Sequence, residues 1–249
     1  MVSEKQLHFR EEFRESIPEG YSGVRHGFTA LAIGIVAFVA FAFFLSEPIR
    51  WYDWLVVPLT MLGWNVVEWI VHTQVLHRPR KNKIARALYV RHTLTHHQFF
   101  THELSELESA RDLSIVFFPV FALPTVLIMT VPAAGIAWLL FSWNAGLLVM
   151  MSVTAMYVLF EVMHLGAHVP DNAFVRYFPL LNTMRRHHIA HHNHRLMMEK
   201  NMNFTFPFMD WLMGTSDVKR GLLGTTFNGY STRFVEAEPS TIRTKRTQG

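Results

Sequence analysis

The chain has 249 residues, of which 50% are hydrophobic and only 17% are charged. A soluble domain carries roughly 25% charged residues, so this composition indicates a protein of the lipid bilayer. Cysteine is absent, which excludes disulfides, thiolate zinc sites and iron–sulfur clusters, and leaves His, Asp, Glu or Asn as metal ligands. The net charge of +4 is better explained by anionic lipid headgroups than by nucleic acid, which we do not expect as a partner.

The N-terminal segment, residues 1–26, is polar and mixed in charge, and we expect it to lie in the cytoplasm. It does not resemble a signal peptide, because charged residues crowd its first half and no small-residue cleavage site follows the first apolar run. Residues 27–215 are predicted to form a membrane domain. Residues 216–249 are predicted to be a cytoplasmic tail, disordered from about residue 236 onward because it lacks a hydrophobic pattern.

Four apolar stretches are predicted to cross the membrane, so the expected fold is an all-α integral membrane protein. They cover residues 28–45, 51–76, 113–131 and 133 to about 165. At a rise of about 1.5 Å per residue, the first stretch is just long enough to cross the hydrocarbon core. Pro132 separates the third stretch from the fourth, and a further break near Ser142 is left open.

The distribution of basic residues predicts the orientation of these helices. The N-terminal segment and residues 78–91 are rich in Lys and Arg, whereas the connections at residues 46–50 and 131–144 nearly lack them. The positive-inside rule therefore places both termini and the long polar segments in the cytoplasm. These polar segments are expected to form a helical cap on the cytoplasmic side.

Thirteen of the fifteen histidines lie in two windows, residues 72–102 and 164–194, which both belong to this predicted cap face. The windows resemble each other. Each is preceded by a glutamate and begins with a histidine pair at the end of an apolar stretch, and each continues about twenty residues later with a histidine triplet. Packing alone gives no reason for such clusters, so they indicate a metal site.

Helical spacing places many of these rings on shared faces. His164 and His168 are one turn apart on one face. His72 and His77 are five residues apart, or about 140° on an ideal helix, so we expect the turn before Pro79 to unwind and bring His77 round. The triplets follow helical spacing as well: His92 and His96 with His97 beside them, and His188, His191 and His192.

Ten imidazoles are predicted to bind metal: His72, His77, His92, His96, His97, His164, His168, His188, His191 and His192. An octahedral metal takes six ligands, so ten imidazoles indicate two metals with open positions, and imidazole suits iron, zinc or copper. Glu68 and Glu161 are expected to accept hydrogen bonds from the ligands and so to orient their rings. His102, His187 and His194 are left open between supporting and surface positions.

At this point the sequence resembles the fatty acid hydroxylase / sterol desaturase superfamily over about residues 60–215. The family's histidine boxes have counterparts in order: His72-x4-His77, His92-x3-His96-His97, His164-x3-His168 and His188-x2-His191-His192. The stretch FPFMDWLMGT, residues 206–215, is similar to the family's terminal segment. A single histidine box is weak evidence for the family. Four boxes in the family's order, placed as expected relative to four predicted spans, are specific evidence for it.

The resemblance implies a membrane enzyme with a non-haem di-iron centre that uses O2 to attack an unactivated C–H bond of a lipid. The lipid classes it implies are fatty acyl chains, sphingolipids, sterols and carotenoids, with zinc able to replace the two irons in recombinant protein. The chain lacks the HPGG haem motif of a fused cytochrome b5 domain. We therefore expect a separate electron donor, either a ferredoxin or cytochrome b5 with its reductase.

Two alternatives remain at this stage. The first is a lipid desaturase on the same scaffold, which box spacing does not separate from a hydroxylase. The second, from a different class, is a membrane metal transporter. A transporter carries ligands near the middle of the bilayer. Here the histidines lie at helix ends and in polar segments, which favours the enzyme.

Overall fold

The computed structural model describes residues 4–46 and 48–236, and every regular element in that part of the chain is a helix. Four helical segments are long and apolar enough to cross a membrane, which confirms the predicted fold class. The spans are α2 (Gly23–Phe43), Trp51–Leu76, α7 (Ala122–Leu140) and α8 (Trp143–His168). The second span consists of a short turn η1 (Trp51–Leu55), helix α3 (Val56–Val71) and a π-helical turn η2 (His72–Leu76).

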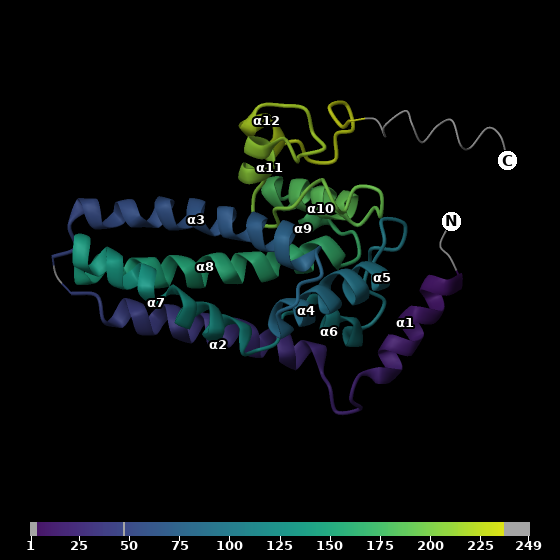
Figure 1. The fold of residues 1–249 in the computed structure, drawn as a ribbon, viewed down its shortest axis with the longest axis horizontal. Coiled ribbons are helices and arrows are strands. Elements are labelled where there is room, and N and C mark those ends of the chain that lie inside the picture. Colours follow the sequence, from purple (N-terminus) through teal and green to yellow (C-terminus); the bar gives the residue numbers. More distant parts are fainter. Residues whose placement is uncertain (1–3, 47, 237–249) are drawn as a thin grey trace.

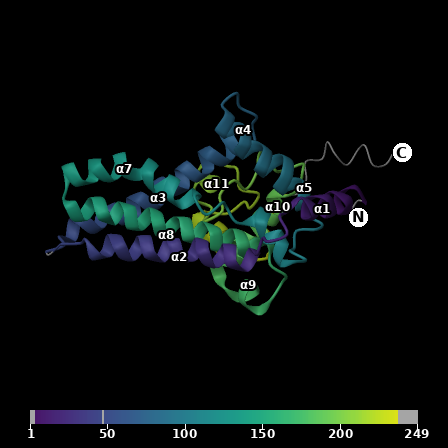
Figure 2. The same ribbon diagram turned by 90° about the horizontal axis from the view of Figure 1, so that it is seen from below.

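Helix α8 is the centre of the membrane bundle. The four spans lie side by side, with their short connections at one end and the remaining helices at the other (Figures 1 and 2). Within the most apolar window of each span, 61% of α8 is buried, against 6–11% of the other three. Helices α2, α3 and α7 therefore surround α8 and present apolar side chains outward, as lipid contact requires.

Small residues let these helices approach closely. A Cβ atom added at Gly34 of α2 would lie 2.6 Å from Val158 on α8. One added at Gly146 of α8 would lie 2.9 Å from the carbonyl oxygen of Ala134 on α7. Close backbone approach at small residues is the usual way for membrane helices to gain packing energy.

The third and fourth spans differ from their predicted bounds. The predicted span 113–131 is a short helix α6 (Leu113–Val116), an irregular connection and the first half of α7. Pro132 lies inside α7 and does not end it, since proline is tolerated within membrane-spanning helices. The chain turns at Ser142, whose hydroxyl accepts a hydrogen bond from the Ala145 N–H at 3.1 Å and caps α8.

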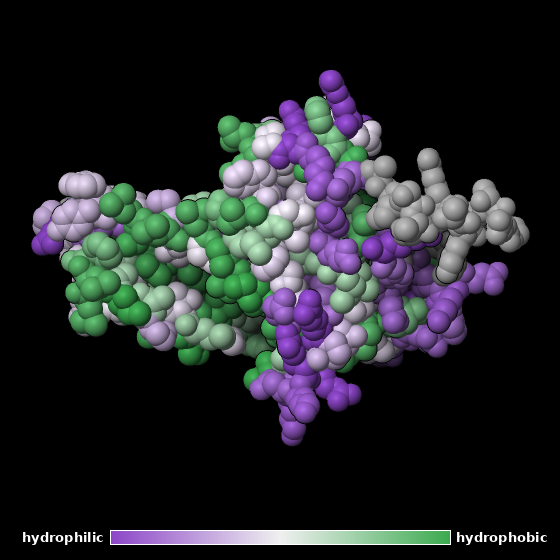
Figure 3. All heavy atoms as spheres, turned by 45° about the horizontal axis from the view of Figure 1, so that its top comes forward, coloured by the Kyte–Doolittle hydropathy of each residue, from purple (hydrophilic) through white to green (hydrophobic). Residues whose placement is uncertain are grey.

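A cap of short helices covers one end of the bundle. Its elements are α1 (Glu4–Ser16), α4 (Lys83–Tyr89), the π-helical turn η3 (Val90–His96), α5 (His97–Phe99), η4 (Ala110–Asp112), α6, α9 (Ala173–Tyr177), α10 (Pro179–His191), α11 (Phe208–Met213) and α12 (Leu222–Thr226). Figure 3 shows hydrophobic side chains gathered over the bundle and hydrophilic side chains over the cap. The change from one to the other marks where a bilayer would end.

Both ends of the described chain pack onto this cap. Arg10 of α1 is fully buried, with its guanidinium 4.5 Å from the ring centroid of Phe99, and Arg14 binds Asp112 through two hydrogen bonds of 2.7 and 2.8 Å. Near the other end, α12 packs against α10 and α11. The predicted disordered stretch falls almost entirely on residues 237–249, which lie outside the described residues.

Candidate metal centre

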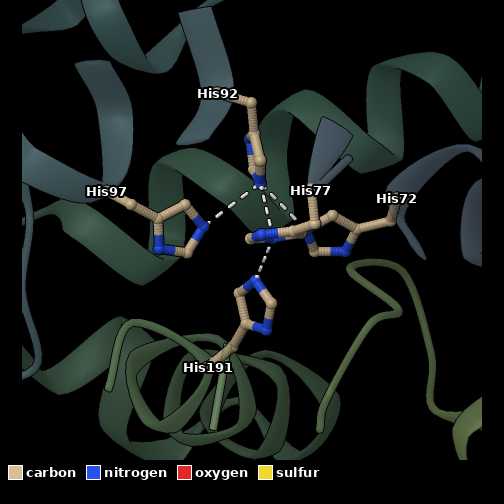
Figure 4. Close-up of side chains that lie close together, drawn as sticks. All are labelled: His72, His77, His92, His97 and His191. Carbon is tan, nitrogen blue, oxygen red and sulfur yellow. Dashed lines mark hydrogen bonds between the residues drawn. The ribbon is translucent and has the colours of Figure 1, made fainter. Parts of the chain in front are cut away.

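Nine of the ten predicted ligand histidines gather into two buried groups. The five-histidine group consists of His72, His77, His92, His97 and His191, and the four-histidine group of His96, His168, His188 and His192. Within each group, one ring nitrogen from every residue lies within 4.8 Å of the others. Figure 4 shows the rings of the five-histidine group pointing toward a common centre from different elements.

The tenth histidine, His164, lies beside the four-histidine group. Its Nε2 is 3.2 Å from Nε2 of His96, and its side chain is buried. It shares α8 with His168, one turn farther along. With His164 included, each group has five imidazoles.

Two π-helical turns build the five-histidine group. In η2 the His77 N–H donates to the His72 carbonyl at 3.2 Å, five residues back, so the wider turn brings these two side chains onto one face. In η3 the His97 N–H likewise donates to the His92 carbonyl. The predicted unwinding before Pro79 is thus replaced by a π turn, which rotates His77 toward His72 without breaking the helix.

This geometry corrects the predicted face of the first triplet. His92 pairs with His97, five residues on, and not with His96, four residues on. Their Nε2 atoms are 3.2 Å apart, whereas His96 turns to the other group. The second triplet is divided in the same way, since His191 joins the five-histidine group and His188 and His192 join the other.

Backbone carbonyls fix which nitrogen faces inward in four of these rings. In the five-histidine group, Nδ1 of His72 donates to the Met202 carbonyl at 2.5 Å, and Nδ1 of His191 donates to Lys200 at 2.8 Å. In the four-histidine group, Nδ1 of His168 donates to the Ser105 carbonyl at 2.8 Å, and Nδ1 of His192 donates to the Phe100 carbonyl at 2.7 Å. A carbonyl can only accept, so Nδ1 carries the proton and Nε2 presents its lone pair to the centre.

The inward nitrogens lie at distances that suit metal ligands. In the five-histidine group, Nε2 of His72 is 2.9 Å from that of His92 and 3.0 Å from that of His77. In the four-histidine group, Nε2 of His188 is 3.1 Å from that of His168 and 3.0 Å from that of His192. Two imidazoles at right angles around a metal, each about 2.1 Å from it, are about 3.0 Å apart.

Facing lone pairs also need a cation between them. His168 and His192 both present Nε2 lone pairs to His188, which has one Nε2 proton at most to share between them. Without a positive ion, at least one such contact is repulsive in a buried site. The donor set therefore fits a transition metal in each group.

Burial also keeps the cap imidazoles in the form that binds metal. It lowers the pKa of His77 to about 2 and that of His191 to about 4, well under the ordinary histidine value. Burial and the neighbouring imidazoles lower the pKa of His92, His97 and His188 too. A neutral imidazole is the ligand that metals take, so no proton has to be displaced near neutral pH.

The two glutamates do not orient the histidines in the described structure, contrary to prediction. Glu68 accepts hydrogen bonds from the backbone N–H groups of Phe204 and Thr205, from the Thr205 hydroxyl at 2.7 Å and from the Trp64 indole at 3.0 Å. Glu161 accepts from the Phe118 N–H at 3.2 Å and the Tyr157 hydroxyl at 2.8 Å. Each carboxylate anchors protein beside the site, and the carbonyls take the orienting role.

Phe204, which sequence reasoning missed, lies against both groups. Its ring centroid is 4.6 Å from that of His72 and 4.8 Å from that of His188, and the side chain is buried. It also packs on Phe160 of α8 at 5.0 Å. No spacing signal marks it, because its place depends on the Glu68 hydrogen bond to its backbone.

Asp210, also missed, holds the loop that supplies two of the orienting carbonyls. Its carboxylate accepts from the N–H groups of Met202 at 2.9 Å and Asn203 at 2.7 Å, and from Nε2 of His187 at 2.8 Å. Burial raises the pKa of a carboxyl group, yet the hydrogen bonds, led by that from His187, hold the pKa of Asp210 below its usual range. Its place in the terminal segment 206–215 was the available signal.

The three histidines left open have separate positions. His187 is buried against Asp210. Nε2 of His194 donates to the His97 carbonyl at 3.3 Å, beside the five-histidine group. His102 lies at the surface, 3.2 Å from the carboxylate of Glu103. His187 and His194 therefore support the site from outside the two groups.

Comparison with known proteins agrees with this geometry. The family model described as fatty acid hydroxylase matches residues 57–215, which include every histidine of both groups and the terminal segment. No curated protein and no solved structure matches the chain. Since the family match covers more than half of the sequence, the chain belongs to the fatty acid hydroxylase family.

Proposed function

We propose that the chain is an O2-dependent hydroxylase that acts on a C–H bond of a membrane lipid through two iron ions. The observation that carries this proposal is the division of neighbouring histidines between the two groups. His96 and His97 are adjacent in sequence but belong to different groups, and so do His191 and His192. This arrangement supports two metals held side by side, and family membership favours iron over zinc or copper.

In this proposal one iron is held by the five-histidine group and the other by the four-histidine group with His164. Two irons there would supply O2 activation and the oxidising power that an unactivated C–H bond demands. The protein supplies neutral imidazoles, and carbonyl hydrogen bonds hold four of them in one tautomer. Every imidazole of both groups is buried, which keeps bulk water from the reacting atoms.

The approach proposed for the substrate is from the bilayer, between α3 and α8. His72 directly follows α3 and His168 is the last residue of α8, so a lipid chain between these helices would lie near both groups. Between these helices, the rings of Trp64 of α3 and Tyr157 of α8 pack edge to face with centroids 6.5 Å apart. The ring of Phe204 packs against that of His72. These aromatic side chains suit a fatty acyl, sphingolipid, sterol or carotenoid substrate.

A separate electron donor remains part of the proposal. Reducing O2 at such a site needs electrons from outside the chain, which carries no haem motif or cysteine for a cluster of its own. A ferredoxin, or cytochrome b5 with its reductase, would meet the cap. We propose that the cap faces the cytoplasm, because the basic residues concentrate there.

A desaturase on the same scaffold is the nearest alternative, and the product separates the two. We expect lipid extracts from cells that express the chain to contain a product 16 mass units above its substrate, formed only with O2. A loss of two mass units would identify a desaturase. If neither product formed under iron-replete, aerobic expression, both the hydroxylase and the desaturase interpretations would be contradicted.

The transporter alternative is less well supported by the geometry. Among residues 4–46 and 48–236, histidine and carboxylate groups that could hold a metal occur only as the two groups at the cap end of the bundle. A transport path needs further ligands along the spans. Metal uptake into vesicles that contain the chain would favour the transporter.

A further inference from the structure

A cluster of unpaired positive charge follows the second span. Arg78, Arg80, Lys81, Lys83 and Arg86 fall within nine residues, and all five are exposed. In the part of the chain that the structure describes, none of them forms an ion pair with a carboxylate. Arg80 donates to the backbone carbonyl of Gln74 at 2.7 Å and to its side-chain amide oxygen at 3.1 Å, which are both neutral groups. We call this cluster the basic segment.

The basic segment lies where the apolar surface ends. Helix α4, which carries Lys83 and Arg86, projects sideways from the molecule near the cap end of the spans (Figure 2). Figure 3 shows a hydrophilic projection beside the hydrophobic surface of the bundle. Apolar side chains are exposed among these charges: Ile84 is 74% exposed, Val90 42% and Leu94 41%. Cations mixed with exposed apolar groups are typical of helices that lie in the headgroup layer.

A cavity of about 520 Å³ opens beside α4, between α1, η3 and α6. Three of its lining residues are cations, Lys83, Arg86 and Arg91, and its apolar wall includes Phe13, Val90 and Ile115. Arg91 is held in place because its guanidinium donates to the carbonyls of Ser114 at 2.9 Å and Phe117 at 2.7 Å. The cavity thus joins positive charge to an apolar surface.

We propose that this cavity binds an anionic phospholipid of the leaflet on the cap side. Its phosphate lies among the three cations, and its acyl chains follow the apolar wall and the exposed Val90 toward the bilayer. The place of α4 at the edge of the apolar surface favours a lipid over an acidic protein, which would have to reach into the headgroup layer. This site is separate from the metal centre, and it stands whatever reaction occurs there.

The test compares lipid binding by the full chain in detergent with and without the two exposed cations. Wild-type protein and the variant K83Q/R86Q are titrated with phosphatidylglycerol, phosphatidylcholine or inorganic phosphate, and bound lipid is counted by native mass spectrometry while the unfolding temperature is followed. The variant K219Q/R233Q removes the same charge from two exposed residues of the last described segment and serves as the control.

We expect phosphatidylglycerol, and neither of the other two, to bind to wild type and raise its unfolding temperature. K83Q/R86Q should bind this lipid roughly 30-fold more weakly, since each cation near an anionic surface contributes about a factor of five. The control should bind like wild type. Because both side chains are exposed, K83Q/R86Q should unfold at the wild-type temperature when no lipid is present. The single variant R86Q should lose less affinity for phosphatidylglycerol than the double variant.

Three results would overturn the proposal. Equal binding of phosphatidylcholine would mean a lipid site without charge selection, and equal stabilisation by inorganic phosphate would mean a plain anion site. If K83Q/R86Q kept its phosphatidylglycerol but lost turnover supported by an acidic electron donor, the basic segment would be a protein docking surface.

Discussion

The two histidine windows look alike in sequence but build their metal groups by different helical geometry. Pairs spaced by five, His72/His77 and His92/His97, lie on π-helical turns and belong to the five-histidine group. Pairs spaced by four, His164/His168 and His188/His192, lie on regular helix or at its C-cap, at or beside the four-histidine group. In each group, the spacing of a pair therefore matches the kind of helical turn that carries it.

Each group is completed by one histidine from the other window. His191 of the second window enters the five-histidine group, and His96 of the first window enters the four-histidine group. This exchange ties η3 to α10 and keeps the two centres adjacent, with the rings of His97 and His192 stacked at 4.3 Å. Substitutions in one window can therefore be chosen to remove ligands from one group while the ligands of the other group stay in place.

The largest effect should come from removing one ligand of each kind of pair. H77A removes a π-turn ligand and H168A removes an α-helical ligand, so each should lower metal content from about two to about one per chain. Both should reduce O2-dependent product by more than 100-fold, since orienting groups alone contribute 10- to 100-fold. Metal analysis and product yield of membrane-inserted protein check this.

The matched control for these two variants is H102A. His102 lies at the surface away from both groups, so its loss should leave metal content and product unchanged. Full activity in H77A or H168A would remove that histidine from the ligand set.

A smaller, one-sided effect is expected from Asp210, which holds the loop whose carbonyls orient two histidines of the five-histidine group. In D210N one acceptor becomes an NH2 group that points at an N–H of Met202 or Asn203, so the loop that carries the Met202 and Lys200 carbonyls loosens. We expect one of the two metals to be released to a chelator at a 10- to 100-fold lower concentration, while the other is held as in wild type.

D171N is the control for D210N, because Asp171 is an exposed carboxylate that pairs with Arg176 at the surface. Equal weakening of both metals in D210N would mean that the two groups do not depend on separate orienting carbonyls.

The smallest effect is expected from Glu68 and Glu161, the two glutamates that precede the histidine windows. Both oxygens of Glu68 accept hydrogen bonds, so an NH2 group in E68Q meets a donor in either orientation. Oε2 of Glu161 is buried without a partner in the described structure, so E161Q can place its NH2 there. E68Q should lose about 1–3 kcal/mol of stability, and E161Q less than about 1 kcal/mol.

Unfolding of the two variants in the same detergent measures this difference. Equal destabilisation would show that Glu161 has a further partner. A larger loss of stability in E161Q than in E68Q would show that Glu161, and not Glu68, accepts the more important hydrogen bonds.

The features that follow from local pattern could be predicted from the sequence. Hydropathy shows four spans, and the ten histidines chosen by spacing are those that gather at the cap end of the bundle. The bounds of α7 could not be predicted, because Pro132 normally ends a soluble helix but is tolerated in a membrane. Here tertiary packing overrides the local signal.

The division of the histidines between groups needed the structure. A spacing of five fits an unwound turn or a π turn equally well, and only packing decides which forms at His72 and His92. The orienting carbonyls of Met202 and Lys200 are backbone groups, which any residue carries, so no side-chain pattern reveals them. The roles of Glu68 and Phe204 depend on contacts between residues more than a hundred positions apart.

The most direct test of the account is the number and surroundings of the metals in protein purified after iron-replete expression. Metal analysis should give about two equivalents per chain. X-ray absorption at the metal edge should show a shell of imidazole nitrogens at about 2.1 Å, the distance that Nε2 separations of about 3 Å imply. One equivalent or none, or a first shell dominated by oxygen, would contradict two histidine groups that each hold a metal.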